Sequence, residues 1–378
     1  MAGPALSDNE RRDRLRLFRT ENVGPVTFRR LLAHFGSAAE ALSALPELSR
    51  RGGRRAPLAP PPAAAAEREI ERLGQLGARL VVWGDAEYPD TLAATEDAPP
   101  VLAVLGHVHL LARSAVAVVG ARNASLNGRR IAEDISAQLG KAGHVVVSGL
   151  ARGIDAAAHT GALPTGTGAL PTGTVAVTAG GIDIVYPEEN RALHGRIAAE
   201  GAIISEVPPG TAPQATHFPQ RNRIISGLAL GCLVVEAALR SGSLITARLA
   251  AEQGREVFAI PGSPLDPRAR GTNDLIRQGA TLTETAADIL GALSAQKPRA
   301  LGAPAEPPYD GPTRAPDSIQ DIGKYRKIVH ECLGPSPLPV DEIIRRCQLS
   351  PAIVSLVLLE LELASRLERH PGNQVSLT

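Results

Sequence analysis

Apolar residues recur at helical spacing in the first part of the chain. One run contains Leu15 and Phe18, and residues 28–35 repeat the pattern after a Val-Gly-Pro break. A third short run covers residues 38–45. The order helix, glycine-containing hairpin, helix is typical of a helix-hairpin-helix or SAM-like module, whose hairpin amides can meet a phosphate. Simple helical packing explains the same pattern, so both interpretations stay open at this point.

From residue 79 the pattern changes to short apolar runs rich in β-branched residues, separated by helical stretches. The runs are RLVVW, AVAVVG, HVVVSG, TVAVTAGG, AIISEV, CLVVEA and EVFAIPG. Continuous apolar strands that alternate with helices predict a parallel sheet covered on both faces. We therefore expect an α/β fold, an extended Rossmann-like doubly wound sheet.

Two segments rich in proline, alanine or glycine interrupt the periodic pattern, at residues 50–66 and 294–318, and are typical of loops or linkers. Beyond the second segment, three short helical runs and a terminal hairpin predict a winged-helix domain. Its third helix, at residues 351–363, carries two glutamates and neither arginine nor lysine. Reading the major groove needs hydrogen-bond donors on that helix, so a role in packing or protein contact is favoured.

These changes of pattern predict a helical domain at residues 1–76, a Rossmann-like domain at 77–293, a linker at 294–320 and a winged-helix domain at 321–378. Inside the Rossmann-like domain the heptapeptide GALPTGT occurs twice in succession, over residues 161–174. Lengthening a surface loop adds little closure entropy, so we assign the duplication no function.

Composition limits the classes of function. The chain has 378 residues, of which 44% are apolar and 21% charged, as in a globular protein with a substantial core. We find no secretory leader pattern and no uninterrupted apolar stretch of about 18 residues, so we expect a cytoplasmic protein without a membrane partner. The three cysteines form no CxxC pair, which predicts buried free thiols and neither a metal site nor a disulfide framework.

The charge of the chain is nearly balanced, at +1, so any nucleic-acid site must be local. Aromatic residues make up only 3% of the chain, which leaves few rings for base stacking. Phosphate contacts would have to dominate such a site. The basic residues cluster at Arg50, Arg51, Arg54 and Arg55, at Arg221 and Arg223, and at Arg268 and Arg270.

Three glycine-containing turns follow predicted strands. They cover residues 120–122, residues 148–152, and Gly180 with Gly181. A strand that ends in glycine before a helix places free amides and the positive end of the helix dipole at the carboxyl edge of the sheet, where anions bind. Arginines in the first two turns add charged forks for phosphate oxygens. Asp155 is placed to cap the helix after the second turn.

The strongest local pattern is HFPQRNRII, directly before the expected helical run IISGLALG. Phe218 can stack on a base, Asn222 can bond a base edge or sugar, and two arginines, Arg221 and Arg223, can hold phosphates. Equally, the ring can fill the core while the arginines pair with acids such as Glu206. Neither a dinucleotide glycine spacing nor a P-loop is present, which disfavours an ordinary NAD or ATP enzyme.

Several long motifs together resemble the DNA-processing protein A (DprA/Smf) family. In chain order they are SGLARGID, GGIDIVYPEEN, SEVPPG, FPQRNRIISGL, EAALRSGSLITARLAAEQGREVFAIPG and GTNDLIRQGA, within residues 80–290. The resemblance implies an extended Rossmann fold that binds single-stranded DNA, protects incoming DNA and loads the recombinase RecA onto it in natural transformation. It also implies a homodimer and no catalytic reaction, so we expect neither a cofactor nor a metal.

By motif, the resemblance implies a DNA pocket built from the three turns, the FPQRNR run and the EAALRSGSLIT run. Its residues would be Gly120, Arg122, Ser148, Gly149, Arg152, Gly180, Gly181, Phe218, Arg221, Asn222, Arg223, Glu236, Ser241, Gly242, Ser243 and Thr246. Glu236 is expected to orient an arginine rather than touch a phosphate. The duplicated heptapeptide departs from the family pattern and could alter one wall of this pocket. The terminal domains vary within the family, so their roles stay open.

The alternative function is an enzyme acting on a nucleotide, because related Rossmann-like proteins include nucleotide phosphoribohydrolases. Glu206, Asp183 or Glu236 would then serve as the acid or base. No compact motif holds two carboxylates together, and the basic run suits a polymer better than a single phosphate. Hydrolysis of a nucleoside monophosphate, abolished in Glu236→Gln, would favour the enzyme.

Overall fold

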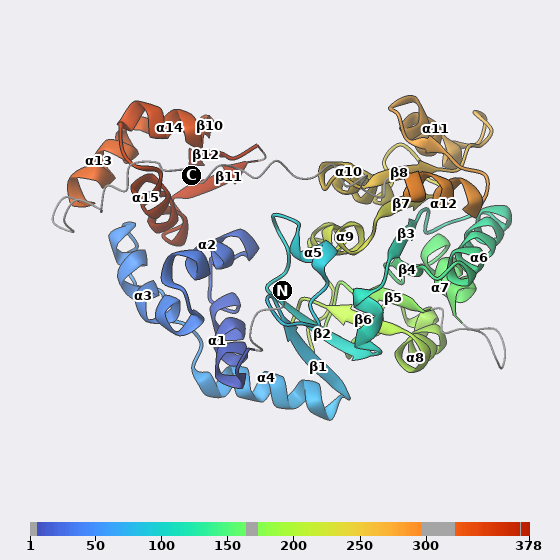
Figure 1. Ribbon diagram of the computed structural model, residues 1–378, viewed down its shortest axis with the longest axis horizontal. Coiled ribbons are helices and arrows are strands. Elements are labelled where there is room, and N and C mark those ends of the chain that lie inside the picture. The colour runs from blue at the N-terminus through green and yellow to red at the C-terminus, as the bar shows by residue number, and fades with distance from the viewer. Residues whose placement is uncertain (1–5, 164–172, 296–321, 371) are drawn as a thin grey trace. The chain divides into compact units, whose positions relative to one another are not determined.

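The computed structural model describes residues 6–163, 173–295, 322–370 and 372–378. The chain forms two compact units (Figure 1). Unit 1 comprises Met1–Arg11 with Ala64–Lys297, and unit 2 comprises Arg12–Ala63 with Pro298–Thr378. Most of the duplicated heptapeptide and the predicted linker at 294–320 lie outside the described residues.

Unit 1 is built on a nine-stranded sheet with the strand order β1-β2-β6-β5-β4-β3-β7-β8-β9. The pairs from β6 to β9 in this order are parallel, and β2 is antiparallel to both of its neighbours. This confirms the predicted α/β fold with a mostly parallel sheet. The strands are β1 Ala78–Val82, β2 Val101–Gly106, β3 Ala115–Val119, β4 Val145–Ser148, β5 Thr174–Val177, β6 Ala202–Ser205, β7 Gly231–Val234, β8 Glu256–Ala259 and β9 Thr281–Leu282.

Helices cover both faces of this sheet, which explains why its strands are apolar throughout (Figure 1). Val147 and Val175 face a layer with α5, α9 and α10, whereas Val146 and Ala176 face a layer with α4, α6, α7, α8 and α12. The helices are α4 Ala63–Gln75, α5 Asp90–Ala93, α6 Leu126–Lys141, α7 Ile154–Ala162, α8 Arg191–Glu200, α9 His217–Leu228, α10 Ser243–Glu252, α11 Arg270–Arg277 and α12 Ala286–Ala295. Short 3-10 helices are η1 Val108–Ala112, η2 Glu188–Asn190 and η3 Pro267–Ala269.

One strand of the sheet departs from the sequence-based expectation. The apolar run of β2 is absent from the predicted strands, and its antiparallel pairing breaks the expected parallel order. The connection from β1 to β2 carries only the four-residue helix α5. A parallel pair is joined by a crossover that usually contains a longer helix, so the antiparallel pairing fits this connection.

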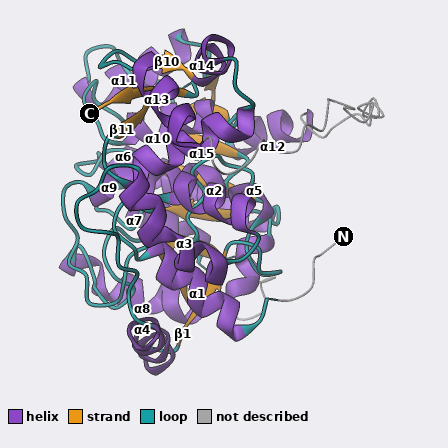
Figure 2. Cartoon of the chain, turned by 90° about the vertical axis from the view of Figure 1, so that its left-hand side faces the viewer, coloured by secondary structure: helices purple, strands orange, loops and turns teal. Residues whose placement is uncertain are grey.

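Unit 2 is mainly helical and contains the predicted winged helix, which the structure confirms as three helices with a small antiparallel sheet (Figure 2). The helix α1 begins in unit 1 and continues into unit 2. The helices are α1 Asp8–Phe18, α2 Pro25–Phe35, α3 Ala38–Arg51, α13 Ile322–Cys332, α14 Val340–Cys347 and α15 Pro351–Leu363. The strands are β10 Leu338–Pro339, β11 Leu367–His370 and β12 Gln374–Leu377.

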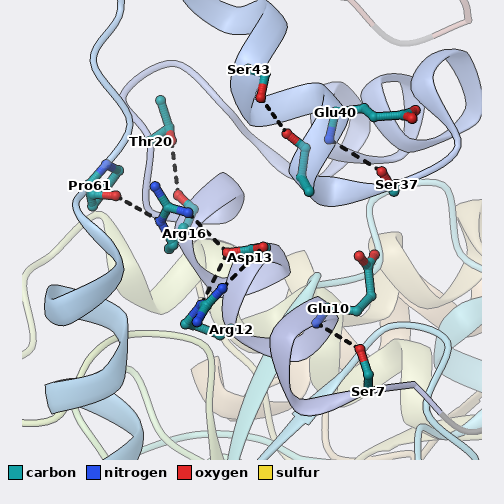
Figure 3. A network of polar contacts seen from close by, with 11 residues as sticks. Ser7, Glu10, Arg12, Asp13, Arg16, Thr20, Ser37, Glu40, Ser43 and Pro61 are labelled. Atoms are coloured by element: carbon teal, nitrogen blue, oxygen red, sulfur yellow. Dashed lines mark hydrogen bonds and ion pairs between the residues drawn. The ribbon is translucent and has the colours of Figure 1, made fainter.

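Charged side chains tie α1 to the loop that follows α3 (Figure 3). The Asp13 carboxylate accepts hydrogen bonds from Arg12 Nε at 3.2 Å and from Arg16 Nη1 at 3.0 Å. Arg16 Nε in turn donates to the carbonyl of Pro61 at 2.9 Å. This proline-rich loop is therefore ordered against a helix in the described structure, although its composition is that of a linker.

The helix α3 is longer than its apolar run at residues 38–45 suggests. It begins at a cap in which Ser37 Oγ accepts from the Glu40 amide at 3.2 Å (Figure 3). It then continues through Pro46 to Arg51. A proline inside a helix removes one amide donor, and here the helix tolerates the loss.

The two halves of unit 2 are far apart in the sequence and bonded to each other in the structure. Thr27 Oγ1 donates to Glu362 Oε1 at 2.5 Å, and Asn22 Nδ2 donates to Ser365 Oγ at 2.8 Å. Burial raises the pKa of Glu362, while the bond from Thr27 and the nearby Arg30 charge oppose the rise. The glutamates of α15 therefore bond within the protein, in agreement with a packing role for this helix.

The described residues contain no helix with the length and apolar composition needed to cross a membrane. They also contain no cluster of histidine, cysteine and acidic side chains that could hold a metal ion. Cys332 and Cys347 lie with their sulfur atoms 3.3 Å apart, a proximity that their sequence spacing does not reveal. Burial, with the bond to Cys332, raises the pKa of Cys347 to about 11, so this thiol stays protonated at neutral pH.

Candidate nucleic-acid interface

A pocket of about 570 Å³ in unit 1 is lined by the turn after β3, the start of α9 and the segment from β7 into α10. We call it the core pocket. In the sheet, β4 lies on one side of β3 and β7 on the other, so the strand order reverses at β3. Doubly wound folds bind their ligands beyond the carboxyl ends of the strands at such a reversal.

The helix α9 presents one face to the core pocket. Phe218, Arg221, Asn222 and Ile225 all line it, and their spacing of three and four residues places them on one side of a helix. Arg223 is two residues from Arg221 and therefore points elsewhere. The FPQRNR run lies inside α9, not before a helix as the sequence suggests, and this separates its two arginines.

Arg221 is a buried cation that forms no ion pair within the described part of the chain. Its side chain lines the core pocket, its Nε has no hydrogen-bond partner, and among the described carboxylates none forms an ion pair with it. Burial lowers the pKa of Arg221 to about 10, and the nearby Asp155 charge opposes this shift. The group still carries its charge at neutral pH, so an unneutralised guanidinium borders the pocket.

The turn after β4 makes room for this guanidinium. A Cβ atom on Gly149 would lie 1.5 Å from Arg221 Nη1, so any side chain there would displace the guanidinium from its present position. The Asp155 carboxylate accepts from the amides of Gly149 at 3.1 Å and Ala151 at 3.4 Å. Asp155 therefore orders this turn and does not cap α7, whose N-cap is Gly153. Burial raises the pKa of Asp155, and the Arg221 charge opposes the rise.

Phe218 lies between a cation and a second aromatic ring. The Arg122 guanidinium carbon lies 5.2 Å from the centroid of the Phe218 ring, and the Tyr186 ring centroid lies 5.6 Å away at an interplanar angle of 54°. Tyr186 is 50% exposed. These three side chains, with Arg152, line a small side pocket that also contains Arg221. The ring of Phe218 is therefore partly accessible and does not serve as a core residue alone.

The start of α10 contributes polar groups and the positive end of its dipole. Ser241, Gly242, Ser243 and Thr246 line the core pocket, with Gly242 at the N-cap. The Ser241 and Ser243 hydroxyl oxygens lie 2.7 Å apart. Asn222 Nδ2 donates to the Gly242 carbonyl at 3.4 Å and so connects α9 to this turn. A helix N-terminus with hydroxyl groups is a favourable place for an anion.

Arg223 is engaged inside unit 1. Its Nη2 donates to both carboxylate oxygens of Glu206, at 2.5 and 2.6 Å, and its Nη1 donates to the Asp97 carbonyl. The side chain is only 12% exposed and does not line the core pocket. Of the two alternatives for this arginine, pairing with an acid is the one observed.

Glu236 bonds to the N-cap of α6. Its carboxylate accepts from the Ser125 amide at 2.9 Å and from Ser125 Oγ at 2.5 Å. A Cβ atom on Gly128 would lie 2.5 Å from the Glu236 carboxyl carbon, so the two segments are in close contact. Glu236 thus stabilises the start of α6, and its charge also acts on Arg268, where it helps to raise the pKa of that arginine after the larger effect of Asp266.

Three further predicted residues lie away from the core pocket. Ser148 is fully buried and donates to the Val118 carbonyl at 2.6 Å. Gly180 and Gly181 pack against residues 208–213, where a Cβ atom on Gly181 would lie 2.6 Å from the nearest carbonyl oxygen. These turns support the sheet edge and bring no donor to the pocket.

Among the lining side chains that sequence reasoning did not assign to the site, Tyr186, Arg240 and Arg268 are the aromatic and basic ones. Arg240 directly precedes the predicted Ser241, and its position in the motif could have identified it. Arg268 was visible only as part of a basic cluster, and it forms an ion pair with Asp266 at 2.9 Å.

The carboxylates proposed for the enzyme alternative do not converge. Glu206 pairs with Arg223, Glu236 bonds to the N-cap of α6, and Asp183 accepts from the Gly210 amide at 2.7 Å. None of the three lines the core pocket, where Asp155 is the one acidic residue among the described residues. The geometry therefore provides no acid and base pair for nucleotide hydrolysis there.

Comparison with known proteins identifies the family. The model described as DNA recombination-mediator protein A matches residues 79–294. Models described as the DprA-like N-terminal HHH domain and the DprA winged helix domain match residues 8–71 and 312–373. Protein Smf of Escherichia coli is 40% identical over 304 residues, covering 79% of this chain and 77% of that protein. DNA processing protein DprA of Bacillus subtilis is 41% identical over 214 residues, covering 56% and 70%.

Solved structures agree with the sequence matches. The X-ray structure of DNA processing protein A from Streptococcus pneumoniae has a TM-score of 0.63 at 34% identity, covering 76% of this chain and 98% of that one. The Helicobacter pylori protein, described for its unique single-stranded DNA binding mode, has a TM-score of 0.51 at 27% identity, covering 58% and 96%. The chain described here belongs to the DNA recombination-mediator protein A (DprA/Smf) family.

Proposed function

We propose that the core pocket binds single-stranded DNA, with Arg221 holding a backbone phosphate. The unpartnered, buried guanidinium of Arg221 is the observation that carries this proposal. Leaving a charge buried and unpaired costs several kcal/mol, on the order of 3 to 5 when a partner is removed. A phosphate oxygen would provide the missing partner, and the space next to Gly149 keeps the guanidinium in place.

The aromatic rings support a single strand over a duplex. Phe218 and the exposed Tyr186 offer faces on which an unpaired base can stack. Stacking of this kind accepts any base, so we expect little sequence preference. Bases inside a duplex are already stacked on their neighbours and are not available to these rings.

We divide the predicted site residues by their contacts. Those we propose to contact DNA are Gly120, Arg122, Gly149, Arg152, Phe218, Arg221, Asn222, Ser241, Gly242, Ser243 and Thr246. Those we propose to support the pocket from within the protein are Ser148, Gly180, Gly181, Arg223 and Glu236.

We further propose that the protein protects incoming DNA and helps to load RecA onto it, as a homodimer and without a catalytic step. The family description as a recombination mediator and the single-stranded DNA binding of the Helicobacter pylori relative support this role. The domain boundaries at residues 76, 293 and 320 remain part of the same proposal.

Fluorescence anisotropy with the full-length chain tests the binding function. A labelled oligo-dT strand and a matching duplex are titrated at several salt concentrations. We expect the single strand to bind more tightly, with an affinity that falls as salt rises, because phosphate contacts release counterions. Equal binding of both forms, or hydrolysis of a nucleoside monophosphate at a useful rate, would contradict the proposal.

A further inference from the structure

Unit 2 contains a second pocket, of about 320 Å³, between α3, α13 and the end of α15. We call it the unit 2 pocket. Four of its lining side chains are permanent cations, Arg51, Arg326, Lys327 and Arg366, and one lining side chain, Glu360, is acidic. The charge of the pocket is therefore positive although the whole chain is almost neutral.

The single carboxylate neutralises only one of these cations. Glu360 has a side chain that is 1% exposed, and it accepts from Arg326 Nε at 2.5 Å and Arg326 Nη2 at 2.9 Å. This pair accounts for both groups and raises the pKa of Arg326, chiefly through its hydrogen bond to the carboxylate. Arg51, Lys327 and Arg366 are the cations that Glu360 does not neutralise.

Arg366 bonds to no carboxylate among the described residues. Its Nη1 donates to the Gly52 carbonyl at 3.4 Å, and its Nη2 lies 2.9 Å from His330 Nε2. A guanidinium can only donate, so the histidine nitrogen is the acceptor in this contact. The charge of Arg366 is therefore not cancelled by either bond.

The other two cations are placed to reach a ligand. Lys327 is exposed, and within the described residues it forms no ion pair. Arg51 pairs with Glu47 at 2.6 Å, but both side chains are more than a third exposed, so solvent weakens this pair. An anion in the pocket can compete for Arg51 and can bind Lys327 directly.

Stabilisation of a helix end explains only part of this arrangement. Arg51 and Arg366 lie at the C-terminus of α3, where cations are favourable. The backbones meet closely there, since a Cβ atom on Gly52 would lie 1.9 Å from the Glu360 carbonyl oxygen. Lys327 comes from α13, however, and plays no part in ending α3.

We propose that the unit 2 pocket is a second phosphate-binding site, which takes a phosphodiester group of the single strand that the core pocket binds. The inference rests on the proposed function for the identity of the polymer. It assigns the winged helix a contact with the DNA backbone through α13 and the residues after α15. The glutamates of α15 would have no part in reading bases.

The test compares short and long oligo-dT strands on the full-length chain by anisotropy. The double variant Arg51→Ala with Lys327→Ala should leave the short strand unaffected and weaken the long one. Two lost phosphate contacts should reduce the salt slope for the long strand by about 1.4. Lys324→Ala, on the same helix but outside the pocket, should change neither strand. A double variant that binds the long strand like the unaltered protein, with an unchanged melting temperature, overturns the proposal.

A second measurement separates failure of this site from failure of the core pocket. The His330 ring resonance, assigned with His330→Gln, should shift when pyrophosphate is added to the full-length chain and should not shift in the double variant. If the His330 chemical shift does not change when pyrophosphate is added, the proposed phosphate site is wrong. A resonance that responds, in a protein that binds neither DNA strand, overturns the DNA assignment together with the proposed function and leaves a phosphate site.

Discussion

Arg221 and Arg223 stand two residues apart on α9 and have opposite environments. Both are largely buried, but Arg223 is bonded to Glu206 and to the Asp97 carbonyl, whereas Arg221 forms no ion pair with any described carboxylate and its Nε has no hydrogen-bond partner. The first is part of the folded structure, and the second is available to a ligand at a cost in stability. Substitution should therefore separate their roles.

Replacing Arg221 with methionine should weaken DNA binding without weakening the fold. The variant Arg221→Met removes a buried charge that forms no ion pair, but it also removes a cation that favours the buried Asp155 carboxylate. These effects oppose each other, so the free energy of unfolding in urea should change by less than about 1 kcal/mol. Loss of one charge-assisted contact should lower affinity for oligo-dT about tenfold or more. A less stable variant that binds normally would show that Arg221 is structural.

The matched variant Arg223→Met should do the reverse. It removes the guanidinium that pairs with the Glu206 carboxylate, whose side chain is 15% exposed. Removing one member of a largely buried pair should cost about 3 kcal/mol of unfolding free energy. The salt slope for oligo-dT, measured below the unfolding temperature, should not change. A slope smaller by about 0.7 at unaltered stability would mean that Arg223 contacts DNA after all.

His159 should make the fold sensitive to acid. Its Nδ1 bonds to Thr174 Oγ1 at 2.7 Å, its Nε2 is buried without a partner, and burial lowers its pKa to about 3. Its contribution to stability is complete above the unfolded pKa of about 6.5 and is lost as pH falls toward the folded value, by about 2 kcal/mol between pH 7 and pH 5. In His159→Gln, the free energy of unfolding measured in urea should not show this loss between pH 7 and pH 5.

Asp155 responds to pH in the opposite direction, which is why the His159 comparison needs a variant and not the unaltered protein alone. Burial raises the pKa of Asp155, so its protonation favours the folded state as pH falls. If the unaltered protein and His159→Gln lose the same unfolding free energy between pH 7 and pH 5, another group controls stability in acid.

At the scale of elements, α6 and α7 approach each other through a glycine. A Cβ atom on Gly161 in α7 would lie 2.1 Å from the Glu133 carbonyl oxygen in α6. Gly161→Ala should force the helices apart and cost about 1 to 3 kcal/mol, seen as a lower melting temperature. Gly195→Ala in α8 is the control, because a Cβ atom there meets open space. This change should raise the free energy of unfolding by up to about 1 kcal/mol, since alanine favours a helix more than glycine does. Equal shifts would contradict this account of the α6 and α7 contact.

The elements of the core could largely be predicted because parallel strands are apolar on both faces and stand out as continuous runs. Their carboxyl ends share one sheet edge, so Gly120, Phe218 and Ser241 come together there as the motifs predict. The strand β2 is also a continuous apolar run and could have been recognised in the same way, but its direction in the sheet could not. Its antiparallel pairing is a property of the assembled sheet.

The division of the site residues could not be predicted from motifs alone. Arg223 and Glu236 have the charge and position of ligand-binding residues, but their partners, Glu206 and Ser125, come from segments far along the chain. Which charge is paired internally depends on tertiary distances. Helical periodicity could have separated Arg221 from Arg223, but only if the FPQRNR run had been assigned to the helix α9.

At the scale of the whole molecule, the near-neutral charge predicts a modest dependence on salt. A short oligo-dT strand in the core pocket can meet Arg122, Arg221, Arg240 and Arg268. Three or four phosphate contacts on a single strand give a slope of about −2 to −3 in a plot of log affinity against log salt concentration. A slope steeper than about −5, measured by anisotropy, would mean that basic surface beyond the core pocket contributes.

The pairing of the two ends of the chain in unit 2 has a consequence for synthesis. Residues 12–63 leave the ribosome about 260 residues before α13, and two of them are bonded to α15 and to Ser365 after it in the folded protein. At about 5 to 20 residues per second, this interval lasts on the order of 10 to 50 seconds. During it, Thr27, which later bonds to Glu362, and Asn22, which later bonds to Ser365, face solvent or a chaperone. Unit 1 can therefore be folded before unit 2 is complete, and unit 2 forms only after release of the last helix.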